Sequence, residues 1–157
     1  MAAHFNIVLF EPEIPQNTGT IGRLAVSTDS KLHLIEPLGF SLEDKYLKRA
    51  GLDYWQHLAP DRYRNWQEFL EKNAPERMFF ISTHGKKSFF DADFQPGDYL
   101  VFGKESAGLP ATFHEKYHDD MLLIPMPGKF SRSLNLANAV SIVLYEALRQ
   151  NPEMLKI

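Results

Sequence analysis

A short polar stretch after residue 130 carries more hydrogen-bonding side chains than its position requires. Ser131, Ser133, Asn135 and Asn138 follow a loop of Pro and Gly and stand where a long helix is expected to begin. One Ser or Asn is enough to cap the free N–H groups of a helix. The other hydroxyls and amides can bind and orient a polar ligand. We interpret the stretch as a candidate site, with a helix cap as the alternative.

A second candidate is the sequence FGKESAGLP at 102–110, which ends a strand-like run in a tight, polar turn. Gly103 can bring backbone against a ligand where no side chain would fit. Gly103 and Gly108 also have the spacing of a phosphate-binding loop, but that motif continues with Lys and Ser or Thr. Here a Leu-Pro pair follows, so the phosphate-loop match fails. A plain connection from strand to helix remains the alternative.

The third candidate lies near the N-terminus, between Glu11 and Arg23. Asn17 stands where a helix is expected to begin, and Arg23 follows about one and a half turns later. An arginine there can reach back over the preceding loop or out to a partner. The alternative is a capping Asn and a solvated Arg.

Residues 114–118 match the H-E-x-x-H pattern of zinc proteases, which places two His on one face of a helix with Glu115 as base. The segment is short and polar, and no third ligand is evident. We interpret it as a surface turn, expect no metal, and keep a zinc hydrolase as the weakest alternative.

Apolar runs predict the strands that position these candidates. The runs are 5–10, 32–35, 78–82, 99–102 and 121–124. Their nearly continuous hydrophobicity is typical of strands covered on both faces. Helices are expected between most of them, beginning near Asn17 or Thr18, at Ser41 and at Asp61, and a last helix carries one wide apolar stripe from Leu136 to Leu148.

This alternation predicts an α/β fold with a mostly parallel sheet and helices on both faces. Ligands of such sheets bind at the carboxyl ends of the strands. The polar turns after Phe10, Ser82, Phe102 and Ile124 are therefore expected at one edge.

The composition indicates a single domain spanning residues 1–157, with a cytoplasmic location. The chain has 44% hydrophobic and 24% charged residues and no cysteine, which excludes disulfides and cysteine-ligated metals. There is no secretion signal or membrane-length apolar run. A net charge of −3 restricts nucleic-acid binding to a local patch.

Taken together, the three candidates resemble the three motifs of the SPOUT superfamily of RNA methyltransferases, in its SpoU branch. N-x-G-x-x-x-R stands at 17–23, F-G-x-E-x-x-G-L-P at 102–110, and I-P-M followed by S-x-N-L-x-N-A-V-S-x-x-x-Y-E at 124–126 and 133–146. The opening NIVLFEPEIPQNTG and the central KRAGLDY resemble members that methylate the ribose 2′-hydroxyl of the tRNA wobble nucleotide. The resemblance covers essentially the whole chain.

The resemblance implies a deep trefoil knot in the C-terminal part, although folded chains rarely thread loops. It also implies that the knot loops hold S-adenosylmethionine, without a metal. The implied cofactor-binding residues are Ile81, Gly103, Ile124, Met126, Ser133 and Leu134.

The implied catalytic residues are Arg23, Asn17, Ser133 and Asn135. A guanidinium is essentially never deprotonated in proteins. We therefore interpret Arg23 as a clamp for phosphate that also stabilises the developing alkoxide, rather than as the base. The other three residues are expected to orient the ribose and Arg23.

The resemblance implies a homodimer in which Arg23 of one subunit faces the cofactor of the other, with the apolar stripe of the last helix and Tyr145 as a candidate interface. It implies the anticodon stem-loop of tRNA as substrate, from leucine isoacceptors, and no appended RNA-binding domain. The candidate phosphate contacts are Lys45, Lys48, Arg49, Arg62 and Arg64, with a solvated face as the alternative. The alternative functions are 2′-O-methylation at another tRNA or rRNA site, or a catalytically silent knotted RNA-binding protein.

Overall fold

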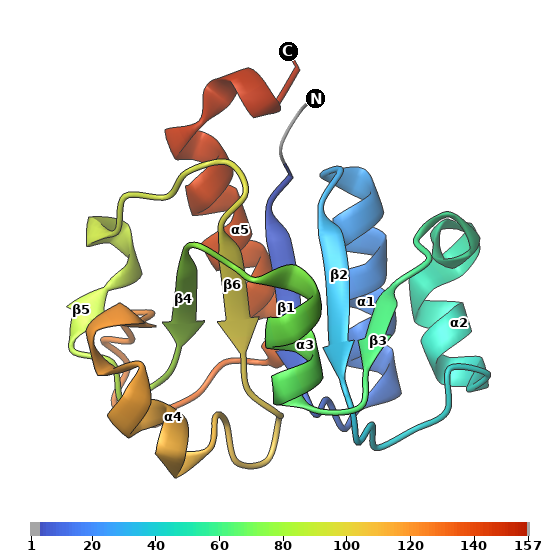
Figure 1. Ribbon diagram of the computed structural model, residues 1–157, viewed down its shortest axis with the longest axis horizontal. Helices are drawn as coiled ribbons and strands as arrows, with labels where there is room; N and C mark the ends of the chain where they lie inside the picture. The colour runs from blue at the N-terminus through green and yellow to red at the C-terminus, as the bar shows by residue number, and fades with distance from the viewer. Residues whose placement is uncertain (1–3, 157) are drawn as a thin grey trace.

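The computed structural model describes residues 4–156, in which strands and helices alternate along the chain (Figure 1). The strands are β1 (Asn6–Phe10), β2 (Lys31–Ile35), β3 (Asp61–Tyr63), β4 (Met78–Ile81), β5 (Lys87–Ser88), β6 (Tyr99–Phe102) and β7 (Met121–Leu123). The helices are α1 (Pro15–Ser27), α2 (Lys45–Gly51), α3 (Trp66–Asn73), α4 (Ala111–Lys116) and α5 (Leu136–Gln150). Short 3-10 turns are η1 (Leu52–His57), η2 (Phe89–Asp91), η3 (His118–Asp120) and η4 (Pro152–Met154).

The strands of this described part form one seven-stranded sheet in the order β3-β2-β1-β6-β4-β7-β5. Each neighbouring pair runs parallel. β1 and β6 lie side by side with Leu9 opposite Phe102. From β1 the chain builds outward to β2 and β3, whereas β6 and its neighbours lie on the other side. Such a switch in strand order is where open α/β sheets bind ligands, beyond the carboxyl ends of the strands.

Apolar layers cover both faces of the sheet, which confirms the predicted α/β class. Ile21 of α1 and Val143 of α5 are buried against one face, and Phe69 of α3 and Phe113 of α4 against the other. Figure 1 shows α3 in front of the sheet and α5 behind it. All five residues of β1 are buried, which explains its continuous hydrophobic run. The knot, which concerns how the chain is threaded, stays a prediction.

The apolar stripe of α5 packs inside the chain's own core. Val140, Val143, Leu144, Ala147 and Leu148 are all buried. The expectation that this stripe forms a subunit interface is therefore wrong. The outward side of α5 carries Ile142 and Tyr145, which are 39% and 51% exposed. Within residues 4–156, none of the helices has the length and hydrophobicity of a membrane span.

The expected helix start at Asp61 is also wrong, because a short strand begins there. Asp61 opens β3, whose Tyr63 is buried and pairs with Ile35 of β2. The helix begins later, at Trp66. Its cap is Asn65, whose side chain accepts a hydrogen bond from the Glu68 backbone N–H at 2.8 Å.

The two earlier helices start differently from the prediction as well. α2 begins after Asp44, whose carboxylate accepts from the Tyr46 backbone N–H at 2.8 Å, rather than at Ser41. α1 begins at Pro15 without a side-chain cap, so Asn17 lies inside its first turn. The amide of Asn17 is therefore available for other contacts.

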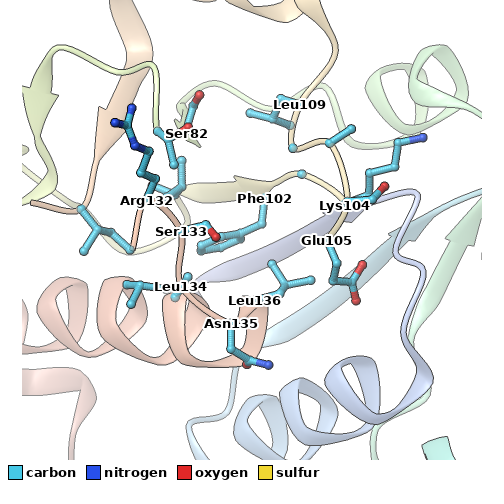
Figure 2. Close-up of a pocket in the computed structure, with 18 of the residues that line it drawn as sticks. Ser82, Phe102, Lys104, Glu105, Leu109, Arg132, Ser133, Leu134, Asn135 and Leu136 are labelled. Atoms are coloured by element: carbon cyan, nitrogen blue, oxygen red, sulfur yellow. The ribbon is translucent and has the colours of Figure 1, made fainter. Parts of the chain in front are cut away.

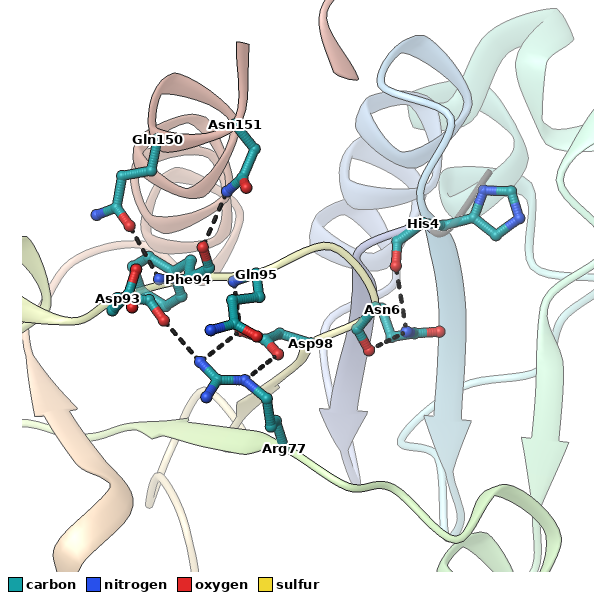
Figure 3. A network of polar contacts seen from close by, with 10 residues as sticks. His4, Asn6, Arg77, Asp93, Phe94, Gln95, Asp98, Gln150 and Asn151 are labelled. Carbon is teal, nitrogen blue, oxygen red and sulfur yellow. Dashed lines mark hydrogen bonds and ion pairs between the residues drawn. The ribbon is translucent and has the colours of Figure 1, made fainter. Parts of the chain in front are cut away.

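A network of polar contacts closes the amino end of the sheet (Figure 3). Arg77 donates through Nε to Asp98 Oδ1 at 2.7 Å and through Nη2 to the Asp93 carbonyl at 2.6 Å. Asn151, just after α5, donates to the Phe94 carbonyl at 3.0 Å. These bonds tie the loop before β6 to the end of α5. They hold β6 and α5 in a fixed relation, and both elements lead into the cavity at the opposite edge.

Candidate active site

A cavity of about 580 Å³ lies at the carboxyl ends of β4, β6 and β7 (Figure 2). Its walls come from the loops after β4 and β6, from the segment before α5, and from the start of α1. Eight of the nine predicted site residues line it: Asn17, Ile81, Gly103, Ile124, Met126, Ser133, Leu134 and Asn135. The structure thus brings the three sequence motifs to one place, and Arg23 is the predicted residue that it leaves outside.

The tight turn after β6 is closed by its own backbone. Lys104 and Gly108 exchange hydrogen bonds, with N···O distances of 3.3 and 2.8 Å. A Cβ on Gly103 would lie 2.1 Å from the carbonyl carbon of Gly108. Gly108 has φ +68°, a conformation that glycine adopts without strain. The packing of the turn therefore requires the glycine at 103. The expected close approach of its backbone to a ligand stays a prediction.

Glu105 joins this turn to the loop after β1. Its carboxylate accepts from the backbone N–H groups of Glu13 at 2.8 Å and Ile14 at 3.0 Å, and from Nδ2 of Asn17 at 3.2 Å. Glu13 returns the contact by accepting from the Ser106 backbone N–H at 2.8 Å. The hydrogen bonds from Ser106 hold the pKa of the Glu13 carboxyl below its usual value. The first and second motifs are thus locked together by two carboxylates.

Asn17 and Asn135 extend this contact to the third motif. Nδ2 of Asn135 donates to Oδ1 of Asn17 at 3.0 Å. Oδ1 of Asn135 in turn accepts from the Asn138 backbone N–H at 3.2 Å, so Asn135 also caps α5. Figure 2 places Glu105 and Asn135 on the side of the cavity nearest α1, with Ser82 and Leu109 across from them. One polar chain therefore links all three motifs.

The rest of the cavity wall is mainly apolar. Phe102, Leu109 and Leu136 are buried side chains that face it. Leu134 is 40% exposed at its rim. The backbone carbonyl of neighbouring Ser133 accepts from the Ser131 hydroxyl at 2.9 Å. Such a mixture of apolar wall and polar rim is typical of sites for small organic ligands.

Arg23 lies on the exposed surface of α1, away from the cavity of its own chain. It follows Asn17 by six positions, a distance of about 9 Å along the helix axis. Its guanidinium carbon lies 5.4 Å from the centre of the Tyr54 ring. Within one chain, Arg23 and the cavity-lining residues do not form one site.

Three of the five candidate phosphate contacts form ion pairs with carboxylates. Lys48 contacts Glu43 at 2.7 Å, Arg62 contacts Glu36 at 3.1 Å, and Arg64 contacts Glu68 at 2.6 Å. The other two, Lys45 and Arg49, both lie over the ring of Tyr46. Carboxylates therefore offset the positive charges of Lys45 and Arg49 less than those of the three paired residues. These two side chains are better able to bind an anionic partner.

Glu105 belongs to the second motif, and its role in joining the motifs is not predicted from the sequence. Its signal was a carboxylate two residues after Gly103, in a turn that needs no charge. Ser82 and His114 were also missed as lining residues; Ser82 Oγ lies 3.4 Å from Nε2 of His114. His114 lies on α4, whereas His118 follows in η3, so the zinc pattern does not share one helix. Within residues 4–156, no three His, Cys, Asp or Glu side chains are placed to hold a metal.

Known proteins resemble this chain over nearly its full length. Residues 4–145 match the SpoU rRNA Methylase family. A tRNA (cytidine(34)-2′-O)-methyltransferase of Saccharophagus degradans is 52% identical over 147 residues, which cover 93% of this chain and 95% of the relative. A protein of the same name from Escherichia coli K12 is 49% identical over 146 residues, covering 92% of each chain.

Solved structures agree with these relatives. One described as giving structural insights into the 2-OH methylation of C/U34 on tRNA has a TM-score of 0.91 and 46% identity, covering 96% of this chain and 98% of that one. The SpoU methyltransferase AviRb from Streptomyces viridochromogenes, in complex with the cofactor AdoMet, has a TM-score of 0.83 and 28% identity, covering 96% of this chain and 59% of that one. From the family match, the full-length relatives and the shared cavity-forming motifs, it follows that this chain belongs to the SpoU rRNA methylase family.

Proposed function

We propose that this protein transfers a methyl group from S-adenosylmethionine to the ribose 2′-hydroxyl of the wobble nucleotide, cytidine or uridine 34, of tRNA. The observation that carries the proposal is the meeting of all three motifs at one cavity, in a chain about half identical to curated C34 methyltransferases. We propose further that it acts as a single domain, in the cytoplasm, on leucine isoacceptors.

The residues around the cavity fit S-adenosylmethionine. A volume of about 580 Å³ lies within the range of roughly 300–1,000 Å³ that small-molecule sites occupy. Phe102, Leu109 and Leu136 offer an apolar surface to the flat adenine base. Ser82 and Ser133 at the rim offer hydroxyls to the polar ribose and amino-acid parts. Ile81, Gly103, Ile124, Met126 and Leu134 complete the proposed binding wall.

The cofactor, when bound, supplies a methyl group on a positively charged sulfur. The protein must then hold the ribose hydroxyl, stabilise negative charge on its oxygen, and let its proton pass to solvent water. We assign the orientation of the ribose to Ser133 together with Asn17 and Asn135, whose amides are fixed by hydrogen bonds. We assign the charge stabilisation to Arg23, because a guanidinium remains charged and binds phosphate or an oxyanion through several N–H groups.

This assignment requires a second copy of the chain. Arg23 does not line the cavity of its own chain, so we propose a homodimer in which it reaches the cavity of its partner. The exposed Ile142 and Tyr145 on the outward side of α5 are the proposed contact surface. We propose Lys45 and Arg49 as contacts to the phosphates of the anticodon stem-loop.

Mass spectrometry of tRNA nucleosides tests the proposed substrate. In the organism that encodes this chain, deletion of its gene should remove 2′-O-methylation at position 34 of leucine tRNAs and leave other ribose methylations in place. A complementing copy should restore the mark, and a copy with Arg23→Ala should not. Loss of a methyl group at another tRNA or rRNA position would favour the alternative methyltransferase. An unchanged set of modifications would favour a silent RNA-binding protein.

A further inference from the structure

We propose that Tyr54 is a positioning residue for Arg23. The guanidinium lies over its ring, which sets the direction in which Arg23 presents its N–H groups to the RNA. The inference rests on the proposed function, which places Arg23 beside the reacting ribose. It adds a residue outside the three motifs to the machinery of the reaction.

A glycine in α1 allows Tyr54 to reach Arg23. A Cβ on Gly22 would lie 2.6 Å from Cζ3 of Trp55 and 2.8 Å from Cδ2 of Leu58. Side-chain carbons do not approach that closely, so η1 packs directly against α1 backbone at this position. Gly22 precedes Arg23, and Tyr54 precedes Trp55, in the chain. The contact at the glycine therefore places Tyr54 beside the arginine.

The geometry of the pair is that of a cation over a ring. The guanidinium carbon of Arg23 lies 5.4 Å from the ring centre of Tyr54, inside the limit of about 6 Å for such contacts. Tyr54 is 40% exposed and Arg23 is exposed, so the pair faces solvent, where an RNA can reach it. A guanidinium stacked on an aromatic face keeps the N–H donors at its edge free for phosphate or an oxyanion.

Four other arginines of this chain are held in a different way. A carboxylate accepts from Nε of Arg62, Arg64, Arg77 and Arg149 at distances of 3.2, 2.6, 2.7 and 2.8 Å. A carboxylate bound in this way occupies N–H donors of the guanidinium and offsets its positive charge. The binding of a phosphate needs both. Among the side chains that the structure describes, Arg23 has a tyrosine ring in place of such a partner, as does Arg49 of the proposed RNA contacts, which lies over Tyr46. The ring orients the cation without neutralising it, which suits a residue that must act on an anion.

The test measures methyl transfer in a single turnover, with saturating tRNA and S-adenosylmethionine. Tyr54→Leu, which removes the ring face, should lower the rate about 2- to 5-fold, the factor expected for losing one exposed cation–π contact. Tyr54→Phe keeps that face and should stay within about twofold of wild type. Phe90→Leu is the matched control, because Phe90 is also exposed but lies on η2, outside the cavity. Its rate should not change.

A combined variant shows whether Tyr54 acts through Arg23. If it does, Tyr54→Leu should cost less than about twofold when Arg23 is already alanine, because the two substitutions then remove the same contact. Binding of S-adenosylmethionine and the melting temperature should be unchanged in every Tyr54 variant. An equal loss with and without Arg23, or a Tyr54→Phe variant as slow as Tyr54→Leu, would overturn the inference.

The same assays separate this inference from the proposed function. A slow Arg23→Ala beside a fully active Tyr54→Leu would refute the positioning role and leave the function intact. Wild-type protein that methylates no tRNA would refute both. A melting temperature that falls in Tyr54→Leu together with the rate would assign Tyr54 to packing of η1 on α1, and would also overturn the inference.

Discussion

At the scale of single residues, the site is organised by a hydrogen-bonded chain with a fixed direction. It runs from the carboxylate of Glu105 through Asn17 and Asn135 to the backbone N–H of Asn138. A carboxylate accepts hydrogen bonds and a backbone N–H donates them. The two ends therefore determine which way each amide points. Asn17 and Asn135 are held in one orientation before any ligand binds.

Glu105→Gln tests the importance of this chain. The new amide group must face at least one of the three donors that now point at the carboxylate, so contact between the first two motifs should weaken. We expect S-adenosylmethionine to bind roughly tenfold more weakly, as for a loss of about 1.4 kcal/mol from a charged hydrogen bond. Calorimetry measures this change. Glu115→Gln, at an exposed position of α4, is the control, and equal affinity in the two variants would contradict the role of Glu105.

His33 in β2 is buried and neutral, and it gives the fold a predictable pH dependence. Its Nε2 lies 2.9 Å from Asn6 Oδ1, and its Nδ1 lies 2.8 Å from the Tyr63 hydroxyl. Burial, reinforced by the charge of Lys31, lowers the pKa of His33 from 6.5 to about 4. The unfolded chain therefore takes up this proton at a higher pH than the folded chain, so stability is complete above pH 6.5 and falls as pH drops toward 4.

We expect the free energy of unfolding to fall by about 2–3 kcal/mol between pH 6.5 and 4.5 because of this one group. Urea unfolding at several pH values measures the slope. His33→Gln removes the titrating group and should flatten the curve, whatever its effect on stability at neutral pH. A slope that survives in His33→Gln would assign the pH dependence to other groups.

At the scale of elements, the turn after β6 connects the sheet to the cavity. Its shape depends on the absence of a side chain at Gly103, because Gly108 and Leu109 backbone atoms fill that space. The same turn places the side chain of Glu105 against the loop after β1. A change in the turn should therefore reach the cavity through two motifs.

Gly103→Ala should abolish detectable S-adenosylmethionine binding, since its methyl group would meet backbone 2.1 Å away and force the turn to open. Gly128→Ala is the matched control, because nothing lies within 4 Å of the added Cβ. We expect that control to bind normally in the same calorimetric titration. Normal binding by Gly103→Ala would mean that the turn tolerates rearrangement and does not shape the cavity.

The sequence predicted these elements unevenly, for physical reasons. Central strands such as β1 and β6 are buried on both faces, and their continuous apolar runs identify them. Edge strands β3 and β5 are only three and two residues long, too short for a periodic signal, so Asp61 was mistaken for a helix cap. The cavity-lining residues were predicted from motifs. The role of Glu105 and the contact of Tyr54 with Arg23 depend on distant segments meeting in space, which no local pattern reports.

At the scale of the whole molecule, the proposed catalytic arginine and the cavity lie apart within one chain. The proposed dimer resolves this by combining Arg23 of one chain with the cavity of the other.

Two inactive chains should then restore activity when mixed. Arg23→Ala keeps its cavity, and Gly103→Ala keeps its arginine, so a mixed dimer contains one complete site. We expect up to about half of the wild-type rate per mixed dimer, measured after subunit exchange is verified. No recovery would indicate that each chain builds its own site.

The proposed reaction transfers a methyl group to one hydroxyl group of one nucleotide. The most direct measurement uses two anticodon stem-loops of a leucine tRNA that differ by a single oxygen, one with ribose and one with 2′-deoxyribose at position 34. Purified protein and S-adenosylmethionine with a labelled methyl group should label the first and leave the second unlabelled, and alkaline digestion should leave an uncleaved dinucleotide at position 34 of the first. Label on the 2′-deoxy stem-loop, or on neither, would contradict the account.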